Sequence, residues 1–320
     1  MFFEKKSYNI VRSGILGVAV GDALGVPFEF KKRYSYKFNS INNMQGYLTH
    51  NQMPGTWSDD TSLTLATLDS LINGYDIKDM GDKFLDWYSK GKYTADDKLP
   101  FDCGITVSRA LIRMKMNNYK AIPLESNNGN GSLMRMLPVV FYIYFNNLEE
   151  SKFKIIEEVS SLTHSHIRSI IGCSIYVEFC LQLLKGYDID TAYKYMQNNI
   201  NGQFHEYKKE LKVYEDILIG NVKRLDEDDI KSSGYIVDSL IASLWCFMTT
   251  SSFSEAVLKA INLGNDTDTI GAITGGIAGL FYGEADIPNG WLKVLRKRDY
   301  IGALSDEYYN KAYENYLKNY

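Results

Sequence analysis

Two apolar segments of this chain carry glycine at every fourth position. Residues four apart lie on the same face of an α-helix, and a glycine in a helix interior costs about 1 kcal/mol relative to alanine. A repeated glycine face therefore indicates that another backbone comes close to the helix. We predict that both helices lie deep in the core. The glycines are Gly17, Gly21 and Gly25 in the first segment, and Gly271, Gly275 and Gly279 in the second.

The rest of the chain also has the pattern of an all-α protein. Apolar residues recur at three- and four-residue spacing, and the 320 residues contain only six prolines, whereas alternating apolar and polar stretches are few. No linker rich in Gly, Ser or Pro separates the segments. The highly charged residues 201–233 are expected to form an exposed helix and loop. Further helices are expected within residues 9–24, 55–71, 78–89, 107–116, 153–162, 166–185, 189–198, 234–249, 253–263 and 268–281.

The charge of the chain argues against binding to nucleic acid. With 35 Lys and Arg against 39 Asp and Glu, the formal net charge is −4. No broad cationic face is therefore available to neutralise a run of phosphates. Any phosphate that the protein binds must be held locally.

The cysteines and the apolar runs indicate a cytoplasmic protein. The four cysteines form no CxxC pair, which favours reduced thiols and gives no indication of zinc. The longest uncharged runs, residues 239–254 and 269–283, are shorter than the roughly 20 apolar residues of a membrane span. We expect no membrane association.

Two helix starts, far apart in the sequence, concentrate carboxylates and hydroxyls. One lies in GTWSDDTSL from Gly55, and the other lies in GNDTDTIGAITGG from Gly264. Helix capping alone would explain one acceptor at each start, but each start offers two carboxylates and a hydroxyl. We infer that the two starts converge in space. They contain Ser58, Asp59 and Asp60, and Asp266, Asp268 and Thr269.

Four carboxylates in a small volume need compensating charge. Two unit charges 4 Å apart repel by about 1 kcal/mol in water and by about 4 kcal/mol at an effective dielectric of 20. An uncompensated cluster would oppose folding or retain protons. Ligand sets made only of oxygen favour Mg²⁺ or Mn²⁺, and two such ions roughly 3.5–4 Å apart can activate water and orient a substrate.

Isoprenoid synthases also use acidic pairs on helices, but two positions exclude that class. Their motifs have the forms DDxx(D/E) and NDxx(S/T)xxxE, and NDTDTIGAI begins like the second. Leu63 stands where the first motif needs its third acid, and Ile273 stands where the second needs glutamate.

Seven segments together resemble the ADP-ribosylglycohydrolase family, which includes dinitrogenase-reductase-activating glycohydrolase and the ADP-ribosyl-acceptor hydrolases. They occur in the family's order between residues 14 and 283. The resemblance implies one domain, residues 1–320, that forms a compact orthogonal bundle of many helices around a central cleft for two metal ions. The segments are GVAVGDALGVPFEF, GTWSDDTSL, FDCGITVSRAL, NNGNGSLMRMLPV, LTHSH, GYIVDSL and GNDTDTIGAITGGIAGLFYG.

The resemblance also implies roles for the two acidic helix starts. They would hold two Mg²⁺ ions, which Mn²⁺ can replace, with Asp268 between both ions and Asp60 as the acceptor of a proton from water. Ser58 stands where the family usually has threonine, and its hydroxyl can still bind a metal. The implied metal ligands are Ser58, Asp59, Asp60, Asp266, Asp268 and Thr269.

Residues elsewhere would complete the site by the same resemblance. Glu29 matches the family's mobile glutamate, which guards the metal site, and it joins Asp60 and Asp268 as a catalytic residue. Asp102 matches an acid that faces the guanidinium in arginine-specific members. The implied contacts to the ADP-ribose are Asn130, Gly131, Ser132 and Met134 at the diphosphate and ribose, His164 near the nucleotide, and Tyr235 on the adenine.

Each of these positions has a structural alternative that the sequence leaves open. Glu29 can be an ordinary surface acid, and Asp102 can be a helix N-cap. The loop NNGNGSLMR can be an ordinary turn, although its glycines permit close approach to a phosphate. Tyr235 can be simply exposed, and His164 can be a structural histidine.

We therefore predict an enzyme, a Mg²⁺-dependent hydrolase that removes ADP-ribose by attack of metal-positioned water at C1″. The favoured substrate is ADP-ribosylated arginine on protein, because of Asp102. Serine, small-molecule ester and nucleobase linkages are alternatives. A non-catalytic crystallin-like or ADP-ribose-binding member and a phosphohydrolase are the other classes. A monomer is expected.

Overall fold

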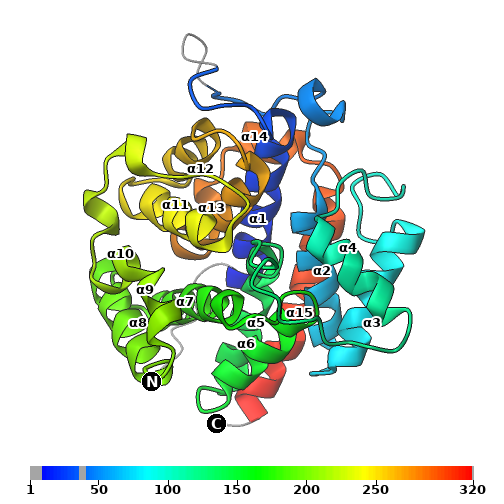
Figure 1. Cartoon of the computed structure of the whole chain (residues 1–320). Coiled ribbons are helices and arrows are strands. Elements are labelled where there is room, and N and C mark those ends of the chain that lie inside the picture. The colour runs from blue at the N-terminus through cyan, green and yellow to red at the C-terminus, as the bar shows by residue number, and fades with distance from the viewer. Residues whose placement is uncertain (1–8, 36–40, 319–320) are drawn as a thin grey trace.

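The computed structural model of the chain describes residues 9–35 and 41–318, and within them the backbone forms helices and no β-strand (Figure 1). The all-α class is confirmed. The helices are α1 (Ile10–Gly25), α2 (Asp59–Ile72), α3 (Ile77–Lys90), α4 (Ile105–Met114), α5 (Leu137–Phe145), α6 (Lys152–Ser161), α7 (Ile167–Leu184), α8 (Ile189–Gln203), α9 (Lys208–Lys212), α10 (Glu215–Leu218), α11 (Ile236–Met248), α12 (Phe253–Asn262), α13 (Thr267–Tyr282), α14 (Asn289–Val294) and α15 (Arg298–Lys318).

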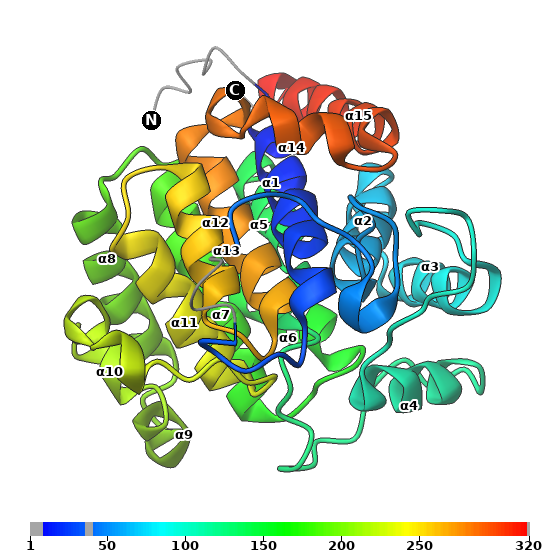
Figure 2. The same ribbon diagram turned by 90° about the horizontal axis from the view of Figure 1, so that it is seen from above.

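The two glycine-lined helices, α1 and α13, pack against each other at the centre of the molecule (Figure 2). A Cβ atom on Gly17 would lie 2.2 Å from the carbonyl oxygen of Gly275, and one on Gly21 would lie 2.0 Å from that of Gly271. No side chain fits at such distances, so the backbones themselves are in contact. Every residue of α1 except Arg12 is buried. The prediction that these helices lie deep in the core is confirmed.

The remaining helices surround this pair. Helices α2 and α15 pack beside α1, and α11 and α12 pack beside α13. Helix α5 contacts α1 from another side, and α7 contacts α13. In the outer layer, α3 packs on α2, α4 packs on α3, and α8 packs on α7. The starts of α2 and α13 therefore lie near the middle of the fold.

Helix α3 shows how local sequence sets an element that borders the site. Its N-cap, Asp76, accepts hydrogen bonds from the backbone N–H groups of the first turn, which have no partner inside the helix. Gly91 ends the helix with a positive φ of 72°, a conformation that glycine adopts without strain. Between these ends the inner face buries Phe84 and Trp87.

The helices expected from apolar spacing are present, and their ends differ by a few residues. Residues 201–233 form the short helices α9 and α10 and two 3-10 turns that are largely exposed, as expected. Helices α5, α14 and α15 were not expected. Helix α5 is apolar on almost every side and is nearly all buried, so it lacks the periodicity that reveals an amphipathic helix.

Two segments are long and apolar enough to cross a membrane by length and composition, Ile10–Phe28 and Ile167–Leu184. The fold itself buries 94% of the most apolar window of the first and 89% of that of the second. Both segments are therefore buried inside the protein, as core helices are.

Candidate active site

The starts of α2 and α13 meet beside the end of α1. The hydroxyl of Thr269 donates to Asp60 Oδ2 over 3.4 Å, although 209 positions separate the two residues. The convergence predicted from the sequence is therefore confirmed. Two groups of carboxylates form here, each with one oxygen per residue within 4.8 Å of the others: Asp22, Asp60 and Asp268, and Glu29, Asp266 and Asp268.

Gly25 lets α13 begin directly against α1. A Cβ atom on Gly25 would lie 2.4 Å from the Cα atom of Asp268. The hydroxyl of Thr267 donates to the carbonyl oxygen of Gly25 over 2.7 Å. The glycine pattern thus places Asp268 next to the one acidic residue of α1, Asp22.

Asp22 holds the first turn of α2. Its carboxylate accepts hydrogen bonds from the backbone N–H groups of Ser58 and Thr61, both over 2.9 Å, and from the Thr61 hydroxyl over 2.6 Å. Free N–H groups at a helix start are thereby satisfied by a side chain from another helix. Burial nevertheless raises the pKa of Asp22 to about 6, because desolvation outweighs these hydrogen bonds.

Ser58 is the N-cap of α2, as the capping interpretation of this motif predicts. Its Oγ atom accepts from the backbone N–H of Asp60 over 3.3 Å and donates to Asp60 Oδ2 over 2.8 Å. The other oxygen of Asp60, Oδ1, is buried and has no hydrogen-bond partner among the described residues. Capping therefore accounts for Ser58 but not for Asp60, because a buried carboxylate oxygen without a donor is costly.

Asp266 stands at the N-cap position of α13, but its side chain caps nothing there. Instead, Asn130 Nδ2 donates to Asp266 Oδ2 over 2.6 Å and to Ser239 Oγ over 2.8 Å. The backbone N–H of Asn130 donates to the carbonyl oxygen of Gly234 over 3.0 Å. The NNGNGSLMR loop, residues 127–135, is thus fixed between α13 and the start of α11.

Five aspartates, called the acidic cluster below, concentrate negative charge at this point. Within residues 9–35 and 41–318, no Lys or Arg nitrogen lies within 4.0 Å of any of their carboxylate oxygens. Burial, followed by the charges of neighbouring carboxylates, raises the pKa of three members well above the usual range. The members are Asp22, Asp59, Asp60, Asp266 and Asp268, of which Asp59, Asp60 and Asp268 have these raised pKa values.

The donor set of the cluster fits hard divalent cations. The groups around the Asp60 carboxylate are other carboxylates and the hydroxyls of Ser58 and Thr269, which bond its Oδ2 atom. Oxygen ligands without thiolate or imidazole suit Mg²⁺ and Mn²⁺. Bound cations would also neutralise the charge that burial leaves uncompensated. The residues that can hold such ions are therefore those of the two helix starts, together with Asp22 and Glu29 beside them.

Glu29 lies at the edge of the cluster and is only 6% exposed, so the interpretation as a surface acid is wrong. Its Oε2 atom is hydrogen-bonded to His50 Nε2. The His50 ring lies between the rings of Phe30 and Phe101, with centroid distances of 5.9 and 5.2 Å. Burial raises the pKa of Glu29 to about 7, although the hydrogen bond from His50 acts in the opposite direction.

Asp102 lies beside Glu29 and His50 at the edge of the acidic cluster, and this edge is called the mouth of the site below. One of its oxygens lies within 4.8 Å of the ligand atoms of Glu29 and His50. It is not the N-cap of α4, because that position belongs to Gly104; its carboxylate accepts from the backbone N–H of Cys103 over 2.9 Å. The alternative as a helix cap is therefore wrong.

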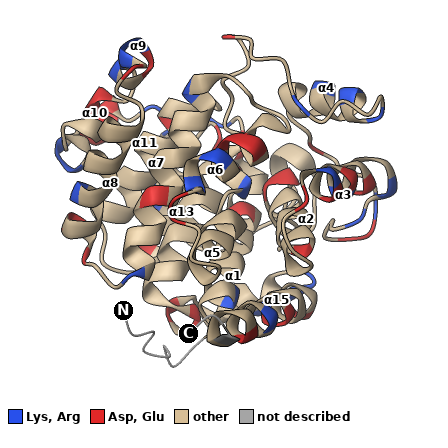
Figure 3. Ribbon diagram, turned by 90° about the horizontal axis from the view of Figure 1, so that it is seen from below, with Lys and Arg blue, Asp and Glu red and all other residues tan. Residues whose placement is uncertain are grey.

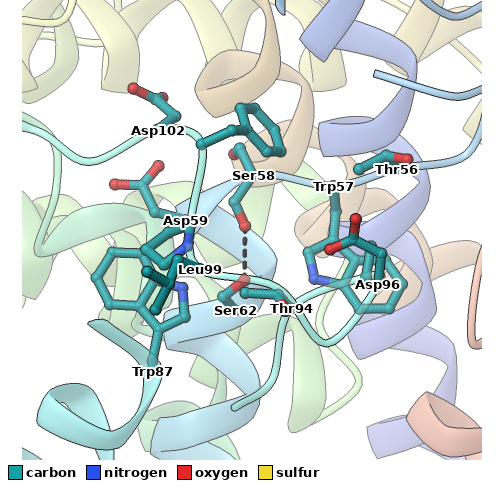
Figure 4. A pocket seen from close by; sticks show the side chains of 13 residues that line it. Thr56, Trp57, Ser58, Asp59, Ser62, Trp87, Thr94, Asp96, Leu99 and Asp102 are labelled. Atoms are coloured by element: carbon teal, nitrogen blue, oxygen red, sulfur yellow. Dashed lines mark hydrogen bonds between the residues drawn. The ribbon is translucent and has the colours of Figure 1, made fainter. Parts of the chain in front are cut away.

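The loop before α4 touches the acidic cluster directly. The backbone N–H of Gly104 donates to Asp59 Oδ2 over 3.5 Å. Figure 4 shows Asp59 and Asp102 on the same side of a pocket that Trp57 and Trp87 also line. The pocket is therefore lined by both acidic and aromatic side chains.

The sequence profile of the ADP-ribosylglycohydrolase family matches residues 4–318. The chain belongs to the ADP-ribosylglycohydrolase family. It is 29% identical over 317 residues to ADP-ribosylarginine hydrolase Tri1 of Serratia proteamaculans (strain 568), with 97% of this chain and 82% of that protein covered. It is 28% identical over 289 residues to the ADP-ribosyl-[dinitrogen reductase] glycohydrolase of Rhodospirillum rubrum, with 88% of each covered.

A solved "ADP-ribosylglycohydrolase-related protein complex" shares the fold of this family member, with a TM-score of 0.77 and 28% identity. The alignment covers 95% of this chain and 98% of that one. The resemblance inferred from seven sequence segments is thus confirmed, and so is the assignment to a family of hydrolases.

In this ADP-ribosylglycohydrolase, His164 is buried beneath the NNGNGSLMR loop. Its Nδ1 atom lies 2.8 Å from Thr163 Oγ1, and burial lowers its pKa to about 3, so the ring is neutral at pH 7. A Cβ atom on Gly131 would lie 3.0 Å from His164 Cε1. Arg135, which is fully buried, donates to the carbonyl oxygen of Gly131 and to Thr163 Oγ1. The structural interpretation of His164 therefore fits.

The other residues predicted to contact the nucleotide differ in how far they are buried. Ser132 is buried, and its Oγ atom accepts from Ser160 over 3.1 Å. Met134 is buried as well, so in this conformation neither residue offers much surface to a ligand. Tyr235 is half-buried at the start of α11, with the Arg168 guanidinium 6.0 Å from its ring centroid.

Two residues of this glycohydrolase site were not predicted from the sequence. Asp22 does have a signal, because it is the only charged residue between Arg12 and Glu29 in a glycine-lined helix. His50 has none. It reaches Glu29 from a turn, residues 47–52, closed by a backbone pairing of Tyr47 with Gln52.

Proposed function

We propose that this protein is a Mg²⁺-dependent hydrolase that releases ADP-ribose from ADP-ribosylated arginine on protein. The observation that carries the proposal is the acidic cluster, with its unpartnered Asp60 oxygen, in a chain of this family. The similarity to ADP-ribosylarginine hydrolase Tri1 supports arginine as the acceptor.

The starts of α2 and α13 would hold two Mg²⁺ ions, which Mn²⁺ can replace. When bound, the ions would supply a lowered pKa for water and a grip on the ribose hydroxyls. Asp268 would lie between the two ions, because its oxygens belong to both carboxylate groups of the cluster. The other ligands would be Ser58, Asp59, Asp60, Asp266 and Thr269.

Asp60 is placed to take a proton from the attacking water. Its Oδ1 atom has no hydrogen-bond partner among the residues that the structure describes, whereas its Oδ2 atom is bonded by Ser58 and Thr269. Water adds its hydroxyl to C1″, the bond from C1″ to the arginine nitrogen breaks, and the proton that the water loses passes through Asp60 to the departing guanidine. Asp60 Oδ1 serves as the base in this scheme.

Asp102 would recognise the guanidinium of the acceptor. A carboxylate can bind a guanidinium through two parallel charge-assisted hydrogen bonds. Asp59 lies beside Asp102 at the mouth and would add to the negative potential there. Glu29 would have to leave its bond to His50 when the ribose enters, in keeping with the role of a mobile guard.

The nucleotide would lie along the NNGNGSLMR loop. Gly129 and Gly131 allow the backbone to approach the diphosphate closely, and Asn130 fixes this loop to Asp266. This arrangement supports local phosphate binding without a basic surface. Tyr235 and His164 would lie at the adenine end.

The proposal is tested by identifying the product. The protein is incubated with arginine-linked and serine-linked ADP-ribosylated peptides, with Mg²⁺ or with EDTA, and the products are identified by mass spectrometry. Release of intact ADP-ribose from the arginine peptide, dependent on Mg²⁺ and lost in Asp268→Ala, is expected. Release of AMP would instead indicate a phosphohydrolase, and equal turnover by Asp268→Ala would contradict the proposed site.

A further inference from the structure

Helix α4 has an apolar face that no described residue covers. Ile105 is 70% exposed, Ile112 is 52% exposed and Met116 is 77% exposed. Ile105 and Ile112 are seven residues apart and lie on one side of α4, and Met116 follows in the turn after the helix ends at Met114. The opposite side packs into the protein, through Val107, Ala110, Leu111 and Met114.

This apolar face begins at the mouth of the candidate site. Gly104, the residue before Ile105, donates its N–H to Asp59 of the acidic cluster. Phe101 contacts the His50 ring and is 37% exposed. We call the surface made of Phe101, Ile105, Ile112 and Met116 the α4 strip.

The position of α4 suits a contact with another macromolecule. Figures 2 and 3 both place α4 at the edge of the molecule beside α3. A helix of ten residues extends about 15 Å at 1.5 Å per residue, so the strip continues well beyond the mouth. A small conjugate of ADP-ribose that enters at Asp102 would not reach Met116.

The strip also carries unpaired positive charge. Arg109 lies four residues after Ile105, is exposed, and has no Asp or Glu oxygen within 4.0 Å among the described residues. Helix α4 has no acidic residue (Figure 3). Apolar side chains around an arginine are typical of protein interfaces.

We propose that the α4 strip docks the folded protein whose modified arginine is the substrate. The partner would lay an apolar surface with an acidic residue opposite Arg109 on this strip, while its ADP-ribosylated side chain enters beside Asp102. This inference rests on the proposed function, because it assumes that the modified arginine enters at that mouth. Several large apolar side chains exposed close to a candidate site are typical of interaction surfaces.

The test compares a protein substrate with a small one. kcat/KM is measured on arginine-ADP-ribosylated actin and on ADP-ribosylagmatine, for the parent and for the double variant Ile112→Asp with Met116→Asp. We expect about a tenfold loss of kcat/KM on actin, which equals about 1.4 kcal/mol, and no change on ADP-ribosylagmatine. Unaltered thermal unfolding would show that the double variant is folded.

Ile219→Asp is the matched control, because Ile219 is 67% exposed and follows α10, on the opposite side of the molecule from α4 (Figure 1). It should change neither value. Equal kcat/KM of parent and double variant on actin, or an equal fall on both substrates, would overturn the inference. A dimer that the double variant dissociates in sedimentation would assign the strip to a second copy and also overturn it. If the parent protein releases ADP-ribose from neither substrate, the proposed function itself is contradicted.

Discussion

The carboxylate of Asp22 accepts hydrogen bonds from both the backbone N–H and the hydroxyl of Thr61, over 2.9 and 2.6 Å. One acidic residue in the central helix α1 thereby fixes the start of α2, which carries Asp59 and Asp60. Hydrogen bonds to charged groups contribute more than those between neutral groups. The position of the acidic cluster therefore depends on this contact.

Thr61→Val should lower the free energy of unfolding by about 1.5–3 kcal/mol, because it removes the hydroxyl donor to a buried carboxylate while keeping the shape of the side chain. Thr67→Val is the matched control. Thr67 lies on the same helix, is fully buried, and donates only to the carbonyl oxygen of Leu63. Urea unfolding of both variants checks this, and an equal loss in the two would contradict a special role for Asp22.

Without divalent ions, the protein should become less stable as the pH rises from about 4 to about 7. The pKa values of Asp22 and Glu29 rise on folding to about 6 and about 7, so the folded state binds more protons than the unfolded state in this window. The stability contributed by these protons is present at pH 4 and is lost as the pH passes the folded pKa values. Unfolding temperatures measured in EDTA between pH 4 and 8 test this. The decline should be much smaller with Mg²⁺, and a flat profile in EDTA would contradict the prediction.

Asp60→Asn should abolish activity and yet stabilise the ion-free protein. Burial penalises the charged form of Asp60, which has no cationic partner among the described residues, and the substitution removes that penalty. The parent should gain about 2.7 kcal/mol from Mg²⁺ at one hundred times its dissociation constant, and the variant should gain far less. Calorimetric unfolding with and without Mg²⁺ separates these effects. An Asp60→Asn protein that Mg²⁺ stabilises as strongly as the parent would contradict the assignment of Asp60 as a ligand.

His50→Phe should shift the acidic limb of the pH profile of kcat/KM to higher pH. The variant keeps an aromatic ring between Phe30 and Phe101 but loses the hydrogen bond that lowers the pKa of Glu29. Glu29 would then hold its proton up to a higher pH. The acidic limb should be missing in Glu29→Gln, which serves as the control. If the acidic limb of His50→Phe lies at the same pH as that of the parent, the limb does not report the titration of Glu29.

Gly21→Ala should destabilise the fold by about 3 kcal/mol or more. The new methyl would lie 2.0 Å from the carbonyl oxygen of Gly271, so α1 and α13 would have to separate. Gly202→Ala is the control, because Gly202 lies in α8 with no atom within 4 Å of a Cβ, and there alanine should add up to about 1 kcal/mol of stability. Denaturant unfolding measures both. A Gly21→Ala protein as stable as the parent would mean that the two backbones can move apart freely.

The central architecture could be predicted because close backbone contact leaves a mark in the sequence. Gly21 and Gly271 are tolerated in helices only for that reason, so their spacing predicted α1 and α13. Asp60 and Asp268 could be paired because two helix starts carried more acceptors than caps need. By contrast, His50 acts through the three-dimensional position of a turn and has no local signal. Helix α5 was missed because it is apolar on almost every side.

The contact of Gly25 with Asp268 affects which substitutions the protein can accept during evolution. The place of Asp268 against α1 is set by two main chains that touch, and a main chain in a helix has no alternative rotamers. Substitutions that alter side-chain volume elsewhere in the interior would lower thermal stability well before they moved Asp268 relative to Asp22. The relative position of these two carboxylates can therefore be kept while the stability of the fold declines.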